Sequence, residues 1–345
     1  MEAKFKVAVF ETLPLLEIIL MNLQVNYPDI QNAAQRAAGV VRRTPLIEND
    51  SLNERVGKRV LVKLECLQHT GSFKWRGAWN AVKKLSETSP KAGVLAYSSG
   101  NHAQGIARAT KLLGLPAVIV MPNDAPAVKI RNTRSYGADV VFYDRPNGES
   151  REALGEALAA ERNLTLIKPY DNIDVIAGQG TCGVEIAEQA AAEGVESASV
   201  FVCCGGGGLT SGIALALDAS DGQYRTFPVE PNAADDVCRS LESGRRESVE
   251  GVPDTDCDAI ITPSPGEITF PILQKYCPRG LSVSDDEMKE AVRFAFDQLK
   301  VVAEPGGSVA LAAAMSQGQR FDADALIVVI TGGNVDAEWL KHTLA

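Results

Sequence analysis

A single lysine stands in a setting that favours amine chemistry. Lys74 lies in the segment Gly71-Ser72-Phe73-Lys74-Trp75-Arg76-Gly77, between a glycine-led turn and a predicted helix start. Gly71 permits the turn, and Ser72 is expected to cap the helix. The rings of Phe73 and Trp75 are expected to exclude water from the amine. Exclusion of water lowers the pKa of an ammonium group, so the neutral amine needed for a Schiff base can form near neutral pH. A solvated surface lysine is the alternative.

A run of four glycines provides the second group of chemical interest. Gly205-Gly206-Gly207-Gly208 follows a predicted apolar strand that ends in Cys203-Cys204, and Leu209 opens a predicted helix. Backbone N–H groups can converge on an anion there, and the helix N-terminus adds its dipole. A structural turn or a dinucleotide site is the alternative, but the G-x-G-x-x-G pattern breaks at Ser211. An amine for a Schiff base and a phosphate cradle together predict a site for pyridoxal 5′-phosphate (PLP).

Two further loops follow predicted strands. Ser98-Ser99-Gly100-Asn101-His102 opens a helix, and its hydroxyl and N–H groups would suit a substrate carboxylate. Thr331-Gly332-Gly333-Asn334 ends the last strand. Ligands bind at the carboxyl ends of strands in parallel sheets, so we expect the four segments to meet there.

Apolar, β-rich runs alternate with helical patterns, which predicts an α/β fold built on twisted, mainly parallel sheets flanked by helices. The expected strands are 60–64, 94–97, 117–121, 140–143, 164–167, 200–204, 226–229 and 326–330. The expected helices are 75–85, 102–113, 151–162, 179–192 and 285–299, the last opened by the capping box Ser284-Asp285-Asp286-Glu287. The polar, proline-containing loop 244–266 would lie either over the mouth of a site or on the plain surface.

The composition limits the classes of function. The 345 residues are 45% hydrophobic and 23% charged, as in an ordinary soluble protein, and the net charge of -10 argues against nucleic acid or a membrane surface as partner. Seven cysteines without regular spacing are expected to be reduced core residues of a cytoplasmic protein. Residues 1–20 have no clear signal-peptide pattern and are expected to be an N-terminal extension.

These segments, in this order, resemble the fold-type II PLP enzymes, and most closely the serine/threonine dehydratase and serine racemase family. The resemblance runs from Arg43-Thr44-Pro45-Leu46 to Thr331-Gly332-Gly333-Asn334-Val335-Asp336. Ala177-Gly178-Gln179-Gly180-Thr181 and Val302-Ala303-Glu304-Pro305-Gly306 are further shared landmarks. The resemblance implies a large PLP-binding domain from residues 21–87 and 174–345, with a small domain from residues 88–173. It also implies a homodimer.

The family resemblance implies a role for each matching residue. Lys74 would hold the cofactor as a Schiff base and remove the Cα proton. The cofactor-binding residues would be Phe73 against the ring, Asn101 at the 3′-oxygen, Thr331 at the pyridine nitrogen, and Gly205, Gly206, Gly207, Gly208 and Leu209 at the phosphate.

The substrate carboxylate would bind to Ser98, Ser99, Gly100, Asn101 and His102, with Ser99 as a second base on the opposite ring face. Arg151 and Ser264 fall where serine racemase contacts its substrate. Glu230, the Ala234 carbonyl and Asp236 resemble the family's divalent-cation loop, which suits magnesium, calcium or manganese. An acidic helix start is the alternative reading of that loop.

The chain departs from serine racemase at two positions near these loops. Tyr97 replaces a histidine and Tyr170 replaces an asparagine. The segment around Glu48 to Leu52 does not reproduce the nucleotide-binding segment of that enzyme, so activation by ATP is not expected. A C-terminal regulatory domain of the kind found in biosynthetic threonine dehydratases is not expected either.

The resemblance predicts an enzyme, a PLP-dependent ammonia-lyase that converts a β-hydroxy amino acid to a 2-oxo acid and ammonia. L-Threonine or L-serine is the default substrate, and 3-hydroxyaspartate is a further candidate because Arg151 could meet a second carboxylate. A serine- or aspartate-type racemase using Ser99 is one alternative. A nucleotide-binding dehydrogenase or binding module is the alternative from a different class.

Overall fold

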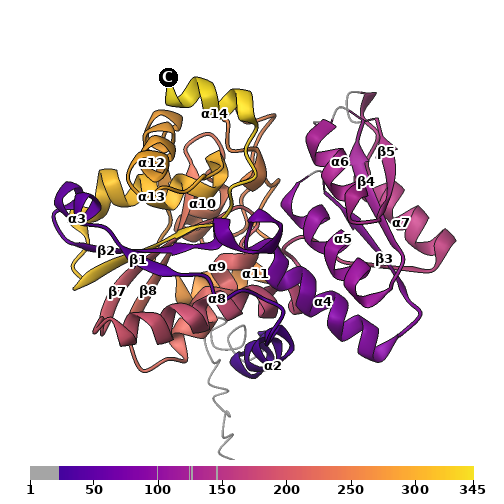
Figure 1. Cartoon of the computed structure of the whole chain (residues 1–345), viewed down its shortest axis with the longest axis horizontal. Helices are drawn as coiled ribbons and strands as arrows, with labels where there is room; N and C mark the ends of the chain where they lie inside the picture. Colours follow the sequence, from indigo (N-terminus) through magenta and orange to yellow (C-terminus); the bar gives the residue numbers. More distant parts are fainter. Residues whose placement is uncertain (1–22, 99, 124, 126, 145–146) are drawn as a thin grey trace, which may run out of the picture.

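The computed structural model describes residues 23–98, 100–123, 125, 127–144 and 147–345. The expected extension at residues 1–20 and the expected second base Ser99 lie outside these ranges. The elements gather around two twisted sheets, which lie side by side in Figure 1. The α/β fold with mainly parallel strands is therefore confirmed.

The larger sheet has six strands in the order β1-β2-β10-β7-β8-β9. Only the edge strand β1 runs antiparallel to its neighbour. The strands are β1 (Leu46–Glu48), β2 (Arg59–Leu64), β10 (Ala325–Ile330), β7 (Ser197–Cys203), β8 (Gln223–Pro231) and β9 (Leu281–Val283). Both faces are covered by helices, which explains the continuous apolar runs of its central strands.

Alternate residues of the central strands serve two cores. Val328 and Ile330 of β10 pack in the core that includes Leu311, whereas Ile327 and Val329 pack in the core that includes Ile213. The first core involves α12 (Asp285–Asp297) and α13 (Pro305–Gln317), and the second involves α8 (Ile173–Ala192) and α9 (Gly208–Asp218). The alternation fixes the register of β10, because a slip of one residue would exchange the two faces.

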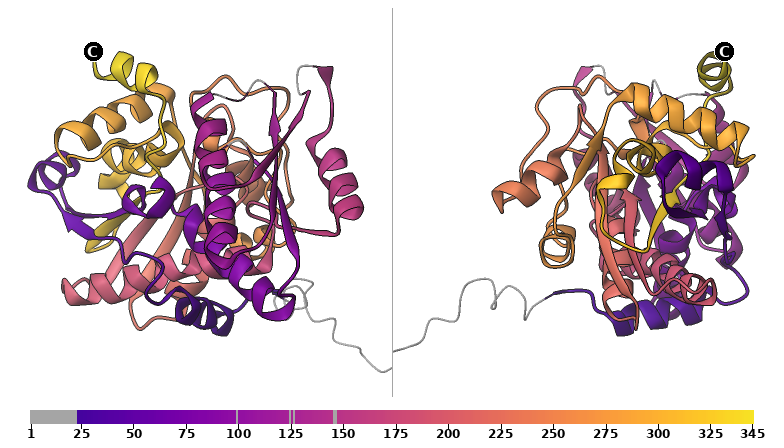
Figure 2. Two further views of the ribbon diagram at one scale, coloured as in Figure 1. Left: turned by 45° about the vertical axis from the view of Figure 1, so that its right-hand side comes forward. Right: turned by 90° about the vertical axis from the view of Figure 1, so that its left-hand side faces the viewer.

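The smaller sheet has four parallel strands in the order β5-β4-β3-β6, all taken from residues 93–166. These are β5 (Asp139–Tyr143), β4 (Ala117–Pro122), β3 (Gly93–Tyr97) and β6 (Leu164–Leu166). One face packs with α4 (Lys74–Thr88) and α5 (Asn101–Leu113), and the other with α7 (Arg151–Arg162). Figure 2 shows the same sheet and its helices from two other sides. The exact division of the chain into two domains stays a prediction.

The remaining α-helices of the described residues have 7 to 11 residues. They are α2 (Tyr27–Ala37), α3 (Asp50–Val56), α6 (Ala127–Ser135), α10 (Asp236–Ser243), α11 (Thr269–Tyr276) and α14 (Ala337–Leu344). No helix of the described ranges combines the length and the apolar character that crossing a membrane requires. All seven cysteines are buried and free, as expected.

One predicted helix begins six residues earlier in the structure than the sequence indicates. The helix predicted from Gln179 begins at Ile173, where the Asn172 side chain accepts hydrogen bonds from the N–H groups of Asp174 and Val175. A glycine in the first turns of this helix serves close packing: a Cβ on Gly178 would lie 2.6 Å from the Cα of Gly77 in α4. The capping box at Ser284 and Glu287 is confirmed, with both reciprocal hydrogen bonds formed.

Candidate functional site

A cavity of about 170 Å³ lies at the carboxyl ends of β3, β7 and β10. Most of the expected site residues line it: Phe73, Lys74, Ser98, Gly100, Asn101, His102, Arg151, Gly205 to Gly208, Leu209 and Thr331. Ser264 does not line it; its hydroxyl accepts a hydrogen bond from Arg246 at 3.3 Å instead. Four segments that are distant in sequence therefore meet at one site, as the strand-end argument predicts.

The Lys74 amine lies in this cavity at the first residue of α4. Its Nζ donates a hydrogen bond to the Pro169 carbonyl at 2.9 Å and lies 5.0 Å from the centre of the Phe73 ring. Burial lowers the pKa of Lys74 to about 8, and the negative charge of Glu304 works against this change. The amine therefore has a substantial neutral fraction near physiological pH, which Schiff-base formation requires.

The expected helix cap beside Lys74 is wrong. Ser72 has an extended backbone and forms an isolated antiparallel bridge with Gly332. The cap position belongs to Phe73, which makes no side-chain cap hydrogen bond, and the buried Ser72 hydroxyl has no partner among the described residues. Pairing with Gly332 fixes the Ser72 backbone, so the lysine segment is held by the C-terminal loop instead of by a local cap.

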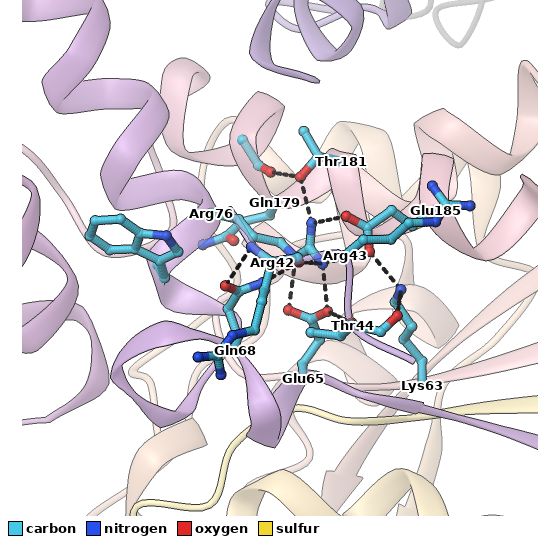
Figure 3. A network of polar contacts seen from close by, with 12 residues as sticks. Arg42, Arg43, Thr44, Lys63, Glu65, Gln68, Arg76, Gln179, Thr181 and Glu185 are labelled. Atoms are coloured by element: carbon cyan, nitrogen blue, oxygen red, sulfur yellow. Dashed lines mark hydrogen bonds and ion pairs between the residues drawn. The ribbon is translucent and has the colours of Figure 1, made fainter. Parts of the chain in front are cut away.

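A buried ionic network holds α4 two residues beyond Lys74 (Figure 3). The Arg76 guanidinium donates to both carboxylate oxygens of Glu65, at 2.7 and 2.8 Å, and to both of Glu185, at 2.7 and 2.8 Å. Lys63 Nζ donates to Glu185 at 2.6 Å. Burial alone would raise the pKa of Glu65, but the Arg76 charge and hydrogen bonds hold it below its ordinary value. Because two cations balance two carboxylates, the helix start is tied to β2 and α8 without a net buried charge.

The glycine run lies where a phosphate cradle is expected. It joins β7 to α9, whose N-cap Gly207 has a φ of 92°, a conformation that favours glycine. Side chains have no room at the preceding positions: a Cβ on Gly205 would lie 2.5 Å from the Ile260 carbonyl oxygen, and one on Gly206 would lie 2.3 Å from the Tyr170 ring. The first turn of α9 lines the cavity, and its N–H groups, which have no partner within the helix, lie at the positive end of the helix dipole. The residues therefore fit the phosphate of PLP.

The loop after β3 offers polar groups without charge. Ser98 Oγ accepts a hydrogen bond from the Gly100 N–H at 3.2 Å. His102 is buried, and burial lowers its pKa to about 3. Its Nε2 lies 3.0 Å from the Ile167 carbonyl, so this nitrogen carries the proton of a neutral ring. A carboxylate here would be bound by hydrogen bonds and not by a histidine cation.

Arg151 brings the positive charge that this loop lacks. It begins α7, lines the cavity, and places its guanidinium carbon 5.3 Å from the centre of the Tyr97 ring. A planar guanidinium over an aromatic face has a fixed orientation, which suits bidentate binding of a carboxylate. Tyr170 lines the same cavity; burial raises its pKa to about 12, although the Arg151 charge works against this change.

Several cavity residues were not assigned a site role from the sequence. Glu304 lines the cavity and accepts a hydrogen bond from Asn101 Nδ2 at 2.6 Å. Tyr97, Tyr170 and the Pro169 carbonyl also line it, as does the segment 258–262 of the long polar loop. Two features of the sequence could have pointed to these residues. Glu304 lies in one of the shared landmarks, and the two tyrosines are departures from serine racemase.

Two buried acidic side chains, Glu230 and Asp236, lie at the end of β8 and at the start of α10. Both carboxylate oxygens of buried Glu230 accept N–H hydrogen bonds, from Val237 at 3.1 Å and from Cys238 at 2.8 Å. Asp236 is buried as well, and its Oδ2 has no partner among the described residues. Burial raises the pKa of Asp236 to about 7, while burial and the Asp236 charge raise the pKa of Glu230 well above its ordinary value.

No group of three or more His, Cys, Asp or Glu side chains in the described ranges is arranged to hold a metal. A cation between Glu230 and Asp236 would therefore need backbone carbonyls and waters to complete its shell. Such oxygen ligands suit Mg²⁺ or Ca²⁺.

Comparison with known proteins agrees with this geometry. Residues 37–333 match the family model of the pyridoxal-phosphate dependent enzymes. The chain is 45% identical over 313 residues to L-threo-3-hydroxyaspartate ammonia-lyase from Pseudomonas sp., a match that covers 91% of this chain and 96% of that protein. It is 38% identical to serine racemase from Schizosaccharomyces pombe, with 92% and 97% covered. The crystal structure of T.th. threonine deaminase superposes with a TM-score of 0.84 at 44% identity, covering 90% and 99%.

Proposed function

Since this chain belongs to the pyridoxal-phosphate dependent enzymes, we propose that it is an ammonia-lyase acting on 3-hydroxyaspartate. The substrate would be converted to a 2-oxo acid and ammonia. Arg151 is the observation that carries this choice: its guanidinium lies in the same cavity as the Lys74 amine, where it can pair with a second carboxylate that threonine and serine lack. The dehydrogenase and non-catalytic alternatives have no remaining support.

The side chains of the cavity divide the work of the reaction. Bound PLP supplies an electron-withdrawing ring that makes the Cα–H bond of an attached amino acid acidic. Lys74, with its pKa lowered to about 8, is the base that takes this proton, and the Pro169 carbonyl holds its Nζ. The glycine cradle binds the phosphate, and Asn101 and Thr331 bind the ring. The uncharged groups of 98–102 bind the α-carboxylate.

A racemase remains the second candidate because of the 38% identity to serine racemase. Racemisation needs a proton donor on the opposite ring face, the role assigned to Ser99. Both reactions begin with removal of the same proton by Lys74. Separation of the products on a chiral column, with 2-oxo acid measured in parallel, distinguishes the two.

The proposal also covers the cation, the domains, the oligomeric state and the location of the protein. We assign a divalent cation to Glu230, the Ala234 carbonyl and Asp236, supported by the unpartnered Asp236 oxygen. The two sheets support a small domain at residues 88–173 and a large domain from residues 21–87 and 174–345. A homodimer follows from the family resemblance, and a cytoplasmic location accords with the seven free cysteines.

The test is a comparison of substrates on two arginine variants. The wild-type enzyme is assayed for 2-oxo acid and ammonia with L-threo-3-hydroxyaspartate, L-threonine and L-serine. Arg151→Gln should lower kcat/KM for 3-hydroxyaspartate by about ten- to 150-fold, the range expected for a charge-assisted hydrogen bond. It should leave kcat/KM for threonine within about threefold. Arg134→Gln is the matched control, because Arg134 also stacks on an aromatic ring, that of Phe142, but does not line the cavity.

Equal losses with all three substrates would show that Arg151 supports the fold or the cofactor and does not select the substrate. Absence of 2-oxo acid from every hydroxy amino acid, with racemised substrate recovered, would favour the racemase.

A further inference from the structure

We propose that Asn334 is a positioning residue that fixes the direction of the Asn101 side-chain amide in the cavity, with Glu304 as the opposing acceptor. This inference rests on the proposed function in one respect, the contact of Asn101 with the cofactor. The resemblance assigns no role to the Asn334 side chain.

A chain of hydrogen bonds joins these side chains. Asn334 Nδ2 donates to the Thr70 carbonyl at 2.7 Å and to Asn101 Oδ1 at 2.7 Å. Asn101 Nδ2 in turn donates to Glu304 Oε1 at 2.6 Å. These hydrogen bonds thus link the first residue of α5 to the segment before Lys74 and to the loops before α13 and after β10.

These hydrogen bonds determine which way each side-chain amide points. Both acceptors of Asn334 are oxygen atoms, so its nitrogen must face them. Asn101 then has to present its oxygen to Asn334 and its nitrogen to the Glu304 carboxylate. A reversed Asn101 amide would place oxygen against carboxylate at one end and N–H against N–H at the other. Since an amide nitrogen carries two hydrogens, one N–H of Asn101 stays available to a ligand in the cavity that this side chain lines.

Two motif glycines leave room for these hydrogen-bonded side chains. A Cβ on Gly71 would lie 2.5 Å from Asn334 Oδ1, and one on Gly332 would lie 1.8 Å from Glu304 Oε1. Gly71 also has a φ of 73°, which follows the φ of 62° at Thr70 and turns the Thr70 carbonyl toward Asn334. The glycines beside Lys74 and Thr331 therefore allow the close approach on which the orientation of Asn101 depends.

The experiment is a double-mutant cycle on cofactor binding. Apoenzyme of the wild type, Asn101→Ala, Asn334→Ala and the double variant is titrated with PLP, and the absorbance of the bound cofactor and the dissociation constant are measured. Asn334→Ala alone should raise the dissociation constant about threefold to tenfold, the effect of one lost neutral hydrogen bond, and shift the absorbance. In the Asn101→Ala background it should add less than twofold and no further shift. Asn334→Asp, which keeps the shape but cannot donate, should resemble Asn334→Ala.

Additive effects in the cycle would overturn the proposal, because Asn334 would then act independently of Asn101. An unchanged dissociation constant and spectrum in both folded Asn334 variants would overturn it as well. If Asn101→Ala itself leaves cofactor binding unchanged, the assumed contact of Asn101 fails and the positioning role with it. The Arg151 substrate assay tests the ammonia-lyase proposal separately.

Discussion

Removal of the cation proposed at Glu230 and Asp236 should destabilise the folded enzyme. Both carboxylates are buried, and Asp236 Oδ2 has no hydrogen-bond partner among the described residues. Without a cation, the charges of the two neighbouring carboxylates repel each other. The start of α10 keeps the hydrogen bonds that the N–H groups of Val237 and Cys238 donate to Glu230. A bound divalent ion removes the repulsion and supplies the missing partner.

Mass action sets the size of the effect. A cation present at about 100 times its dissociation constant stabilises the folded state by roughly 2.7 kcal/mol. The entropy of unfolding is about 2.1 cal/mol/K per residue, so for a cooperative unit of this length the melting temperature should fall by about 4 °C. The assay is thermal unfolding of the holoenzyme after EDTA treatment and after addition of Mg²⁺, Ca²⁺ or Mn²⁺, with 2-oxo acid formation measured in parallel.

Two variants make this test specific. Asp236→Asn should show a lowered melting temperature that added cation hardly restores. Asp235→Asn is the matched control: it removes the adjacent charge, which pairs with Arg239 at 2.8 Å on the partly exposed side of the helix, and should keep the full response to the cation. An EDTA-treated wild type with an unchanged melting temperature and an unchanged rate of 2-oxo acid formation would refute the cation site. Glu230 and Asp236 would then be acidic residues of an ordinary helix start.

Three further predictions concern the cavity. Lys74→Ala should abolish turnover and the cofactor absorbance at an unchanged apoenzyme melting temperature, whereas Lys83→Ala on the surface of α4 should be normal; turnover by Lys74→Ala would refute its assignment as the base. The rate at which apoenzyme reacts with PLP should rise with pH and reach half its maximum near pH 8, because burial lowers the pKa of Lys74 to about 8. Glu304→Gln should move this midpoint to lower pH, since the carboxylate raises that pKa; a midpoint near 10 in the wild type would contradict the burial argument. Gly206→Ala should weaken PLP binding at least tenfold in a titration, because its Cβ would lie 2.3 Å from the Tyr170 ring; wild-type affinity would show that the cradle can adapt.

The sequence predicted those parts of the site that depend on local pattern. The glycine run, the 98–102 loop and Thr331 each end a predicted strand, and the rule that ligands bind at the carboxyl ends of parallel strands brought them to one cavity. Lys74 was found because its sequence neighbour Phe73 also lies beside it in space. The other expected ring, that of Trp75, does not line the cavity and packs against Trp79 instead. The longer strands, which form continuous apolar runs, were likewise predicted within a few residues.

Residues that reach the site by tertiary packing could not be found in this way. Glu304 meets Asn101 across 203 positions of sequence, and the Pro169 carbonyl meets Lys74 across 95. The edge strands β1 and β9 have only three residues each, too few to show a period. Ser72 has the residue type of a cap, but its pairing with Gly332, near the other end of the chain, overrides that local preference.

The motif glycines show how far a local interpretation reaches. Gly71 is predicted to permit a turn before Lys74, and its φ of 73° agrees with that prediction. Its lack of a side chain also matters to Asn334, which is 263 positions away and has no local sequence relation to it. Gly332 leaves the same kind of space for Glu304. A glycine in a motif can therefore serve a turn and a distant contact at once, and the structure is needed to tell the two roles apart. An alanine at Gly71 would both strain the backbone and displace Asn334. Asn334→Ala, in contrast, removes the contact and leaves the turn.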